Sequence, residues 1–297
     1  MNIFTNRLKQ TLLLAAGLSL VAPVAMANTW TGTANYKATS GATGDEAIVG
    51  PFDTYDFGTG IGLIKSSGPI AENSTFTGYF RTMVNGHFLG AQGINVSQLD
   101  ISGGTNFTGT GNGFELTLIS QITGFYSNIS AAGINLNVTG GTAKLYSDTT
   151  PDYSFANDSG FDDGDLVLSG SITGGTGSIL FPGVIGIGVE QVNLDFSGAF
   201  GGYDTNVYEP DTIASGSALF SIRTKSVLNP NTPIIDAVWA GSKSVGGISA
   251  SSIGELAELD GKLQITAVPL PTAVWLFGAG LMSLLAGGKR KKTPYNV

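Results

Sequence analysis

Apolar and polar residues alternate along most of the middle of this 297-residue chain. The alternation is clearest in Phe114–Leu118, Ile134–Val138, Val192–Phe196 and Ala218–Ile222. A period of two places one face of each strand on a core and the other in water, as in antiparallel sheets. The pattern predicts a single all-β domain over residues 28–267, and we expect an antiparallel sandwich or a jelly-roll-like fold.

The alternation is interrupted near the end of this region. Residues Ser251–Leu259 have the pattern of one short helix, and the prolines of Val227–Pro233 predict a loop. Alternation resumes at Lys262–Thr266, which we expect to be the last strand. The domain should therefore end close to residue 267.

Three short segments repeat a Gly-Gly pair after an alternating strand: Ser102–Thr105, Thr139–Thr142 and Thr173–Thr176. Their spacing resembles a repeat, but the echo stops after three copies. Gly-Gly is a common two-residue hairpin turn, so we interpret the segments as recurring hairpins rather than as a solenoid.

The amino-acid composition limits the secondary structure, the chemistry and the partners that this chain can have. Glycine accounts for 44 of 297 residues, about twice its usual share of roughly 7%, and disfavours long helices. The absence of cysteine excludes disulfides, thiolate catalysis and Cys-ligated metals. The middle of the chain has eight basic and 22 acidic residues, a net charge of −14 that opposes binding to nucleic acid.

Residues 1–27 have the pattern of a cleavable signal peptide. Arg7 and Lys9 precede the short apolar run Thr11–Ala22, and Ala25 and Ala27 form an A-x-A site for signal peptidase. Cleavage after Ala27 predicts export. The alternative interpretation is a retained anchor helix.

Residues 268–297 have three parts. The first is a proline motif of Val268, Pro269, Leu270 and Pro271, and the second is the apolar stretch 272–288. Val268–Gly288 is 21 residues, about 31 Å if helical, which matches a hydrocarbon core of about 30 Å. The third part is a basic cluster that would stay cytoplasmic and orient the span across the inner membrane: Lys289, Arg290, Lys291 and Lys292.

This order of parts resembles the PEP-CTERM sorting signal in its Val-Pro-Leu-Pro form, and Trp275–Gly278 continues the resemblance. In that family an exosortase recognises the tail and cleaves near the prolines. The resemblance implies transient retention in the inner membrane, then release to the cell surface or extracellular matrix. Pro269-Leu270-Pro271 replaces the commoner Pro-Glu-Pro, and a plain C-terminal membrane anchor is the alternative.

A second resemblance lies in the middle of the chain. Leu136–Tyr146, Asp163–Gly170 and Gly174–Gly177 look like the central region of flocculation-associated PEP-CTERM proteins. The likeness covers about 40 residues and implies a role in floc formation with exopolysaccharide. It supplies no catalytic residues.

Few residues have a pattern that points to catalysis. His87 is the sole histidine and lies at an apparent turn, and we interpret it as a surface or satisfied residue. No Gly-x-Ser-x-Gly elbow, His-Glu-x-x-His helix or phosphate-binding loop occurs.

The acidic residues are densest between 148 and 165. Oxygen ligands on a turn-rich segment suit Ca²⁺, although the spacing does not match an EF-hand. The candidate calcium ligands are Asp158, Asp162, Asp163 and Asp165, and a solvated acidic loop is the alternative.

The sequence therefore predicts a non-enzymatic exported protein of the surface or matrix, with no resident cofactor and with exopolysaccharide as its partner in biofilm or flocs. Two other classes stay open: a calcium-stabilised carbohydrate-binding module and an extracellular glycan hydrolase. Aromatic residues that could stack on sugars are Trp30, Tyr55, Tyr126, Tyr203 and Tyr208, although half-buried sheet aromatics are the simpler reading.

Overall fold

The computed structural model describes residues 28–44, 46–102, 113–180, 187–197, 202–225, 230–250 and 256–268. Residues 29–267 form one compact unit. Its elements are β1 (Gly32–Asn35), the 3₁₀-helix η1 (Tyr36–Ala38), β2 (Ile48–Phe52), β3 (Thr54–Ser66), β4 (Thr75–Leu89), β5 (Gln92–Ile94), β6 (Glu115–Ser130), β7 (Gly133–Asp148), β8 (Asp165–Leu180), β9 (Ile187–Asp195), β10 (Gly202–Tyr203), β11 (Tyr208–Glu209), β12 (Ile213–Thr224), α2 (Pro233–Ala240), β13 (Ser244–Val245), β14 (Ile248–Ser249) and β15 (Leu256–Ala267).

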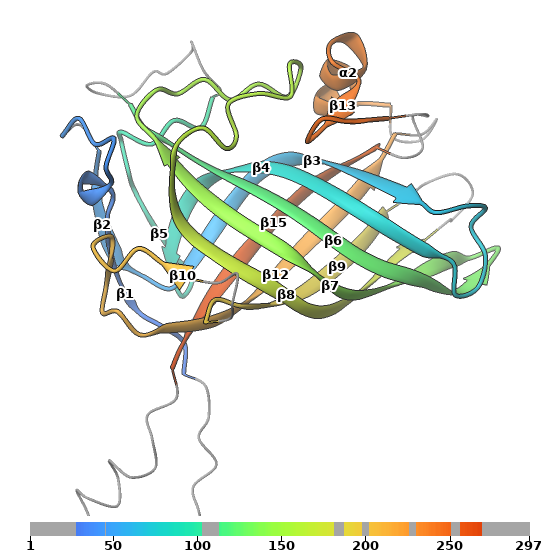
Figure 1. The fold of residues 1–297 in the computed structure, drawn as a ribbon, viewed down its shortest axis with the longest axis horizontal. Helices are drawn as coiled ribbons and strands as arrows, with labels where there is room; N and C mark the ends of the chain where they lie inside the picture. Colours follow the sequence, from blue (N-terminus) through green and yellow to red (C-terminus); the bar gives the residue numbers. More distant parts are fainter. Residues whose placement is uncertain are drawn as a thin grey trace, which may run out of the picture. The chain divides into compact units, whose positions relative to one another are not determined.

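Eight long strands form a closed antiparallel barrel (Figure 1). Around the ring the order is β3-β4-β6-β7-β8-β9-β12-β15. Each long strand therefore pairs with the next long strand along the chain. The ring closes where β15 pairs with β3, with Leu263 opposite Tyr55. The expectation of an all-β antiparallel domain is confirmed, but the sandwich or jelly-roll form is wrong, because one sheet closes on itself instead of two sheets packing face to face.

The barrel is packed with large rings that lie over glycines of neighbouring positions. A side chain at any of these glycines would collide with the ring beside it. The pairs are Phe80 with Gly62 and Gly78, Phe76 with Gly124, Phe196 with Gly170 and Gly216, and Phe220 with Gly261. Alternating large and small residues is how a small barrel fills its tapering interior. These glycines therefore lie in strands, where they leave room for neighbouring rings, and not in turns.

Two of the three Gly-Gly pairs lie inside strands. Gly140–Gly141 is in β7 and Gly174–Gly175 is in the neighbouring β8, each beside a register shift. Gly141 (φ 152°) and Gly174 (φ 159°) have a backbone that side chains rarely allow, as expected at bulges that bend a barrel strand. The hairpin interpretation is wrong for these two pairs, and Gly103–Gly104 lies outside the described residues.

One end of the barrel is closed by the small sheet β11-β1-β2 and by η1 (Figure 1). The aromatic side chains there are almost completely buried: Trp30, Tyr36, Phe52, Tyr55, Phe114 and Tyr208. We call this group, together with His87, the aromatic end cluster. Its rings meet edge to face or tilted, with centroids 4.8–6.0 Å apart, in the geometry that aromatic pairs favour.

Helix α2 and the β13–β14 hairpin cover part of the barrel's outer surface (Figure 1). Ile235 and Val238 of α2 pack with Ile61, Leu63 and Leu256 in a second apolar cluster. The loop predicted over residues 227–233 is wrong at its end, because Pro233 is the first helical residue, a position where a missing N–H costs nothing. The helix expected over 251–259 is also wrong where it can be seen, because Leu256 begins β15.

Candidate functional site

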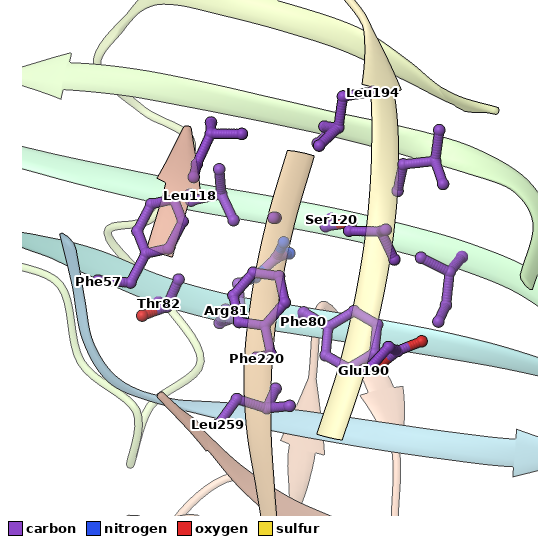
Figure 2. Close-up of a pocket in the computed structure, with 16 residues that line it drawn as sticks. Phe57, Phe80, Arg81, Thr82, Leu118, Ser120, Glu190, Leu194, Phe220 and Leu259 are labelled. Atoms are coloured by element: carbon purple, nitrogen blue, oxygen red, sulfur yellow. The ribbon is translucent and has the colours of Figure 1, made fainter. Parts of the chain in front are cut away.

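The lumen of the barrel is lined mainly by apolar side chains. Alternation turns one face of every strand inward, and the space in the middle of the barrel is lined by Phe57, Phe80, Arg81, Thr82, Leu118, Ser120, Ile122, Ala143, Ile172, Glu190, Val192, Leu194, Ala218, Phe220, Leu259 and Leu263 (Figure 2). The room for the centres of water-sized molecules is about 30 Å³, which is more than the roughly 10–15 Å³ that one water needs.

Glu190 is the one carboxyl in this lining. Strand β9 places it inward in phase with Val192 and Leu194, and only 2% of its surface is exposed. Its Oε1 has no hydrogen-bond partner in the described part of the chain. Burial raises the pKa of the Glu190 carboxyl to about 7, because it disfavours the charged form.

The other polar side chains of the lumen have partners of their own. The Ser120 hydroxyl donates to the Thr142 carbonyl (3.0 Å), and the Thr82 hydroxyl donates to the Gly58 carbonyl (2.8 Å). The Arg81 guanidinium forms an ion pair with Asp158, with Nε 3.9 Å from Oδ1, although this Nε has no hydrogen-bond partner among the described residues, and it lies 5.9 Å from the ring centroid of Phe161. Glu190 is thus the lumen residue left with an unused acceptor.

In the aromatic end cluster, by contrast, four polar side chains bond to one another. The Tyr55 hydroxyl lies 3.0 Å from that of Tyr36 and 2.7 Å from that of Tyr208, and the Tyr36 hydroxyl lies 2.9 Å from His87 Nε2. Burial raises the pKa values of all three tyrosines. The chain of bonds stabilises a plug of rings in one arrangement.

His87 belongs to this chain and not to a turn. It lies in β4 with none of its surface exposed. Burial lowers its pKa to about 3, so the ring is neutral near neutral pH. Its described polar neighbour is a tyrosine rather than a serine or a carboxylate, an arrangement without a nucleophile-base pair.

The four aspartates proposed as calcium ligands do not converge. Asp158 accepts hydrogen bonds from the Ser244 hydroxyl (2.9 Å) and from the N–H groups of Gly246 (2.8 Å) and Gly247 (2.7 Å), and so fixes the β13–β14 turn. Asp165 accepts from the Gly41 N–H (2.7 Å) and the Ser40 hydroxyl, which lower its pKa.

Asp162 and Asp163 are exposed. Among the described residues, no group of three or more His, Cys, Asp or Glu side chains has the geometry to hold a metal ion. Calcium binding at the four aspartates stays a prediction.

Beside this loop lies a completely buried acid, Glu115. Its Oε2 accepts from the Asp152 N–H (3.0 Å) and the Tyr153 N–H (3.3 Å). Burial raises its pKa to about 9, with a further contribution from the carboxylates of Asp152 and Asp148. Glu115 therefore ties the acidic loop to the start of β6 in its neutral form.

The aromatic residues considered for sugar stacking are mostly inaccessible. Trp30, Tyr55, Tyr126 and Tyr208 are buried, and Tyr203 is partly buried. Trp30 Nε1 donates to the Pro210 carbonyl (2.9 Å), and the Tyr126 hydroxyl bonds to Ser66 (2.7 Å). These rings contribute to the core.

The predicted targeting residues lie almost wholly outside the described part of the chain. This applies to Ala25 and Ala27, to Pro269–Pro271, to the stretch 272–288 and to the basic residues 289–292. Val268 is described and is half-exposed. Within the residues that can be described, no helix is both long enough and apolar enough to cross a membrane.

Sequence reasoning missed Glu190, yet the signal is present. The alternation noted from Val192 to Phe196 extends back to Gly188, and Glu190 then falls in the apolar phase. A carboxyl in the buried phase of a strand marks a position where an ionisable group has been taken out of water.

The fold and the lumen define the class of this protein: an eight-stranded antiparallel barrel in which consecutive strands are neighbours, with one end plugged and one acid in an apolar interior. No protein-family model, no curated protein and no solved structure matches the chain.

Proposed function

We propose that the chain is an exported, non-enzymatic protein of the bacterial surface or matrix, sorted by an exosortase and associated with exopolysaccharide in biofilm or flocs. The resemblance of residues 268–297 to an exosortase sorting signal supports this location, together with the signal-peptide pattern of residues 1–27. The burial of His87 among tyrosines supports a non-enzymatic role.

The surface proposed to bind exopolysaccharide is the outer surface of strands β6–β9. Many of its outward residues carry hydroxyl or amide groups that align in rows across the strands, alongside the exposed apolar side chains of Ile129, Leu166, Leu180 and Val189. One row is Gln121, Thr142 and Ser171, and another is Asn137, Thr176 and Gln191. We call this surface the outer polar face.

Hydroxyl and amide groups in rows suit a hydroxyl-rich polymer, because each can donate or accept a hydrogen bond. Charges on the face are few, Lys144 and Asp195 among them, although the domain as a whole is strongly acidic. A long polymer can make many such weak contacts at once, which raises its overall affinity without any deep pocket.

Retention on a gel of the host's exopolysaccharide tests the partner. The variant with Thr142→Val, Thr176→Val and Gln191→Ala should elute earlier than the wild type, because it loses a hydrogen-bonding group from three neighbouring strands. Asn85→Ala with Gln264→Ala is the matched control, since it removes exposed amides from β4 and β15, and it should elute with the wild type. Equal retention of all three proteins contradicts the proposal, and loss of retention with a chelator favours the calcium-dependent alternative.

Deleting residues 268–297 tests the sorting. We expect the truncated protein to be lost from the cell surface and the cells to aggregate less. Unchanged deposition and aggregation would show that the tail is not a sorting signal. Release of reducing sugar from the exopolysaccharide by the wild type would instead indicate a hydrolase.

A further inference from the structure

The interior of the barrel offers a second, separate place for a ligand. Between the lumen side chains the room for the centres of water-sized molecules is about 30 Å³, which suits only a small ligand. In Figure 2 the Glu190 carboxyl points in among these side chains. A cavity with an apolar wall and one convergent polar group is the usual form of a small-molecule site.

Water alone fits this space poorly. A buried water usually makes about three hydrogen bonds, and empty apolar cavities stay dry. Here the hydroxyls of Ser120 and Thr82 already donate to backbone carbonyls, and the Arg81 guanidinium pairs with Asp158. The lining would therefore offer a water the Glu190 carboxyl and, beyond it, only the acceptor oxygens of these hydroxyls.

An occupant with one cationic donor and an apolar body fits both parts of the lining. We propose that the lumen binds a small amphipathic amine, with its ammonium group on the Glu190 carboxylate and its hydrocarbon against Phe57, Phe220 and Leu259. A charge-assisted hydrogen bond to Glu190 supplies the unused acceptor with a partner. Burial of the hydrocarbon adds the apolar contribution.

The site goes beyond the proposed matrix role, because it lies on the inner face of the strands, whereas the outer polar face points away from the lumen. The two can fail independently. The dimensions restrict the amine to a short one, because room for water-sized centres is only about 30 Å³ and longer bodies would displace Phe80 or Phe220.

A titration of the purified full-length protein with ethylamine and butylamine tests the proposal. The alcohol and the carboxylate of the same chain lengths serve as matched ligands, and calorimetry is combined with NMR of the Leu259 and Ile172 methyl groups. At about pH 8, above the Glu190 pKa of about 7, the acid is ionised and the amines are protonated. We expect the amine to bind, the alcohol to bind more weakly and the carboxylate not to bind, with shifts at the lumen methyls.

Glu190→Gln keeps the shape of the side chain and removes its charge. It should weaken amine binding by about ten- to hundredfold, the effect of losing one hydrogen bond to a charged group, and leave alcohol binding unchanged. The double variant Glu190→Gln with Gln191→Glu restores the net charge at an exposed neighbour and should behave like the single variant. Ala218→Leu, which fills the cavity, should abolish binding of both ligands.

Three results would overturn the proposal. The first is no methyl shift with either amine, and the second is an alcohol that binds as tightly as the amine. The third is recovery of amine binding in the double variant, which would assign it to non-specific attraction by an acidic protein.

Discussion

The aromatic end cluster and the middle of the lumen are both buried, but they treat polar groups in opposite ways. In the cluster, the three tyrosine hydroxyls and His87 Nε2 bond to one another. In the lumen, Glu190 Oε1 has no described partner. A connected buried network stabilises one arrangement even though His87 Nδ1 has no described partner, whereas an isolated unsatisfied group lowers stability.

The same physical cause also acts with opposite sign in the two regions. Burial disfavours the charged form of any side chain, so it lowers the pKa of His87 to about 3 and raises that of Glu190 to about 7. The two regions should therefore respond to pH in opposite directions, which makes the comparison measurable.

Acid should act on the cluster with the largest effect. As the pH falls below about 6.5, the unfolded chain protonates His87 while the folded chain holds it neutral down to about pH 3. The free energy of unfolding should fall by about 5 kcal/mol over this range because of His87 alone. Urea unfolding of the wild type and of His87→Gln, between about pH 7 and 3, isolates the contribution as the difference between the two curves; parallel curves would contradict it.

A rise in pH should act on the lumen. The unfolded chain loses the Glu190 proton near pH 4.5, whereas the folded chain retains it until about pH 7. The contribution of protonated Glu190 to the free energy of unfolding is therefore fully present below about pH 4.5. The free energy of unfolding should decrease by about 3 kcal/mol as the pH rises from about 4.5 to about 7, and the Glu190 contribution should not change further above that pH. Glu190→Gln should lack this decrease in the same urea experiment. A variant that keeps the full slope would place the titrating group elsewhere.

Packing in the lumen can be tested at Gly261. The rings of Phe57 and Phe220 stack across it with centroids 5.8 Å apart, and a Cβ there would overlap Phe220 and the Leu219 carbonyl. Gly261→Ala should lower the free energy of unfolding by about 1–3 kcal/mol. Gly86→Ala, with its nearest neighbouring atom 3.8 Å from the new Cβ, is the control and should change it much less. Equal effects would mean that backbone freedom, rather than crowding, decides.

The smallest effect should follow removal of one hydroxyl from the cluster. Tyr55→Phe takes away the group between the Tyr36 and Tyr208 hydroxyls and should cost about 1–2 kcal/mol in thermal or urea unfolding. Tyr79→Phe, on the second apolar cluster, is the matched control and should be nearly neutral. If both substitutions were neutral, the hydrogen-bond chain would contribute nothing and the rings alone would stabilise the plug.

The strands could be predicted from the sequence because alternation is local. Ile134–Val138 and Ala218–Ile222 lie in β7 and β12 as expected, and the strand predicted over Lys262–Thr266 lies within β15. Closure could not be predicted, because a sandwich and a barrel have the same period of two and differ only in whether the edge strands β3 and β15 meet.

Glycine misled the sequence reading for a related reason. Gly140-Gly141 has the composition of a turn, and only the neighbouring strand reveals that it is a bulge. Helix α2 was missed because Pro230 and Pro233 suggest a loop, although proline is favoured at the first helical position. Glu190 could have been found from its phase beside Val192, but the cavity in front of it depends on side chains from distant strands.

Closure of the ring also sets the order of assembly as the chain is made. β3 begins at Thr54 and its partner β15 ends at Ala267, so the seam joins segments about 200 residues apart in synthesis. Until the last strand emerges, β3 and β12 present unpaired backbone edges, which are templates for association with other chains. Such distant pairing slows folding. A nascent chain that stops short of Leu256 therefore exposes the unpaired edges of both β3 and β12, because their shared partner β15 is missing.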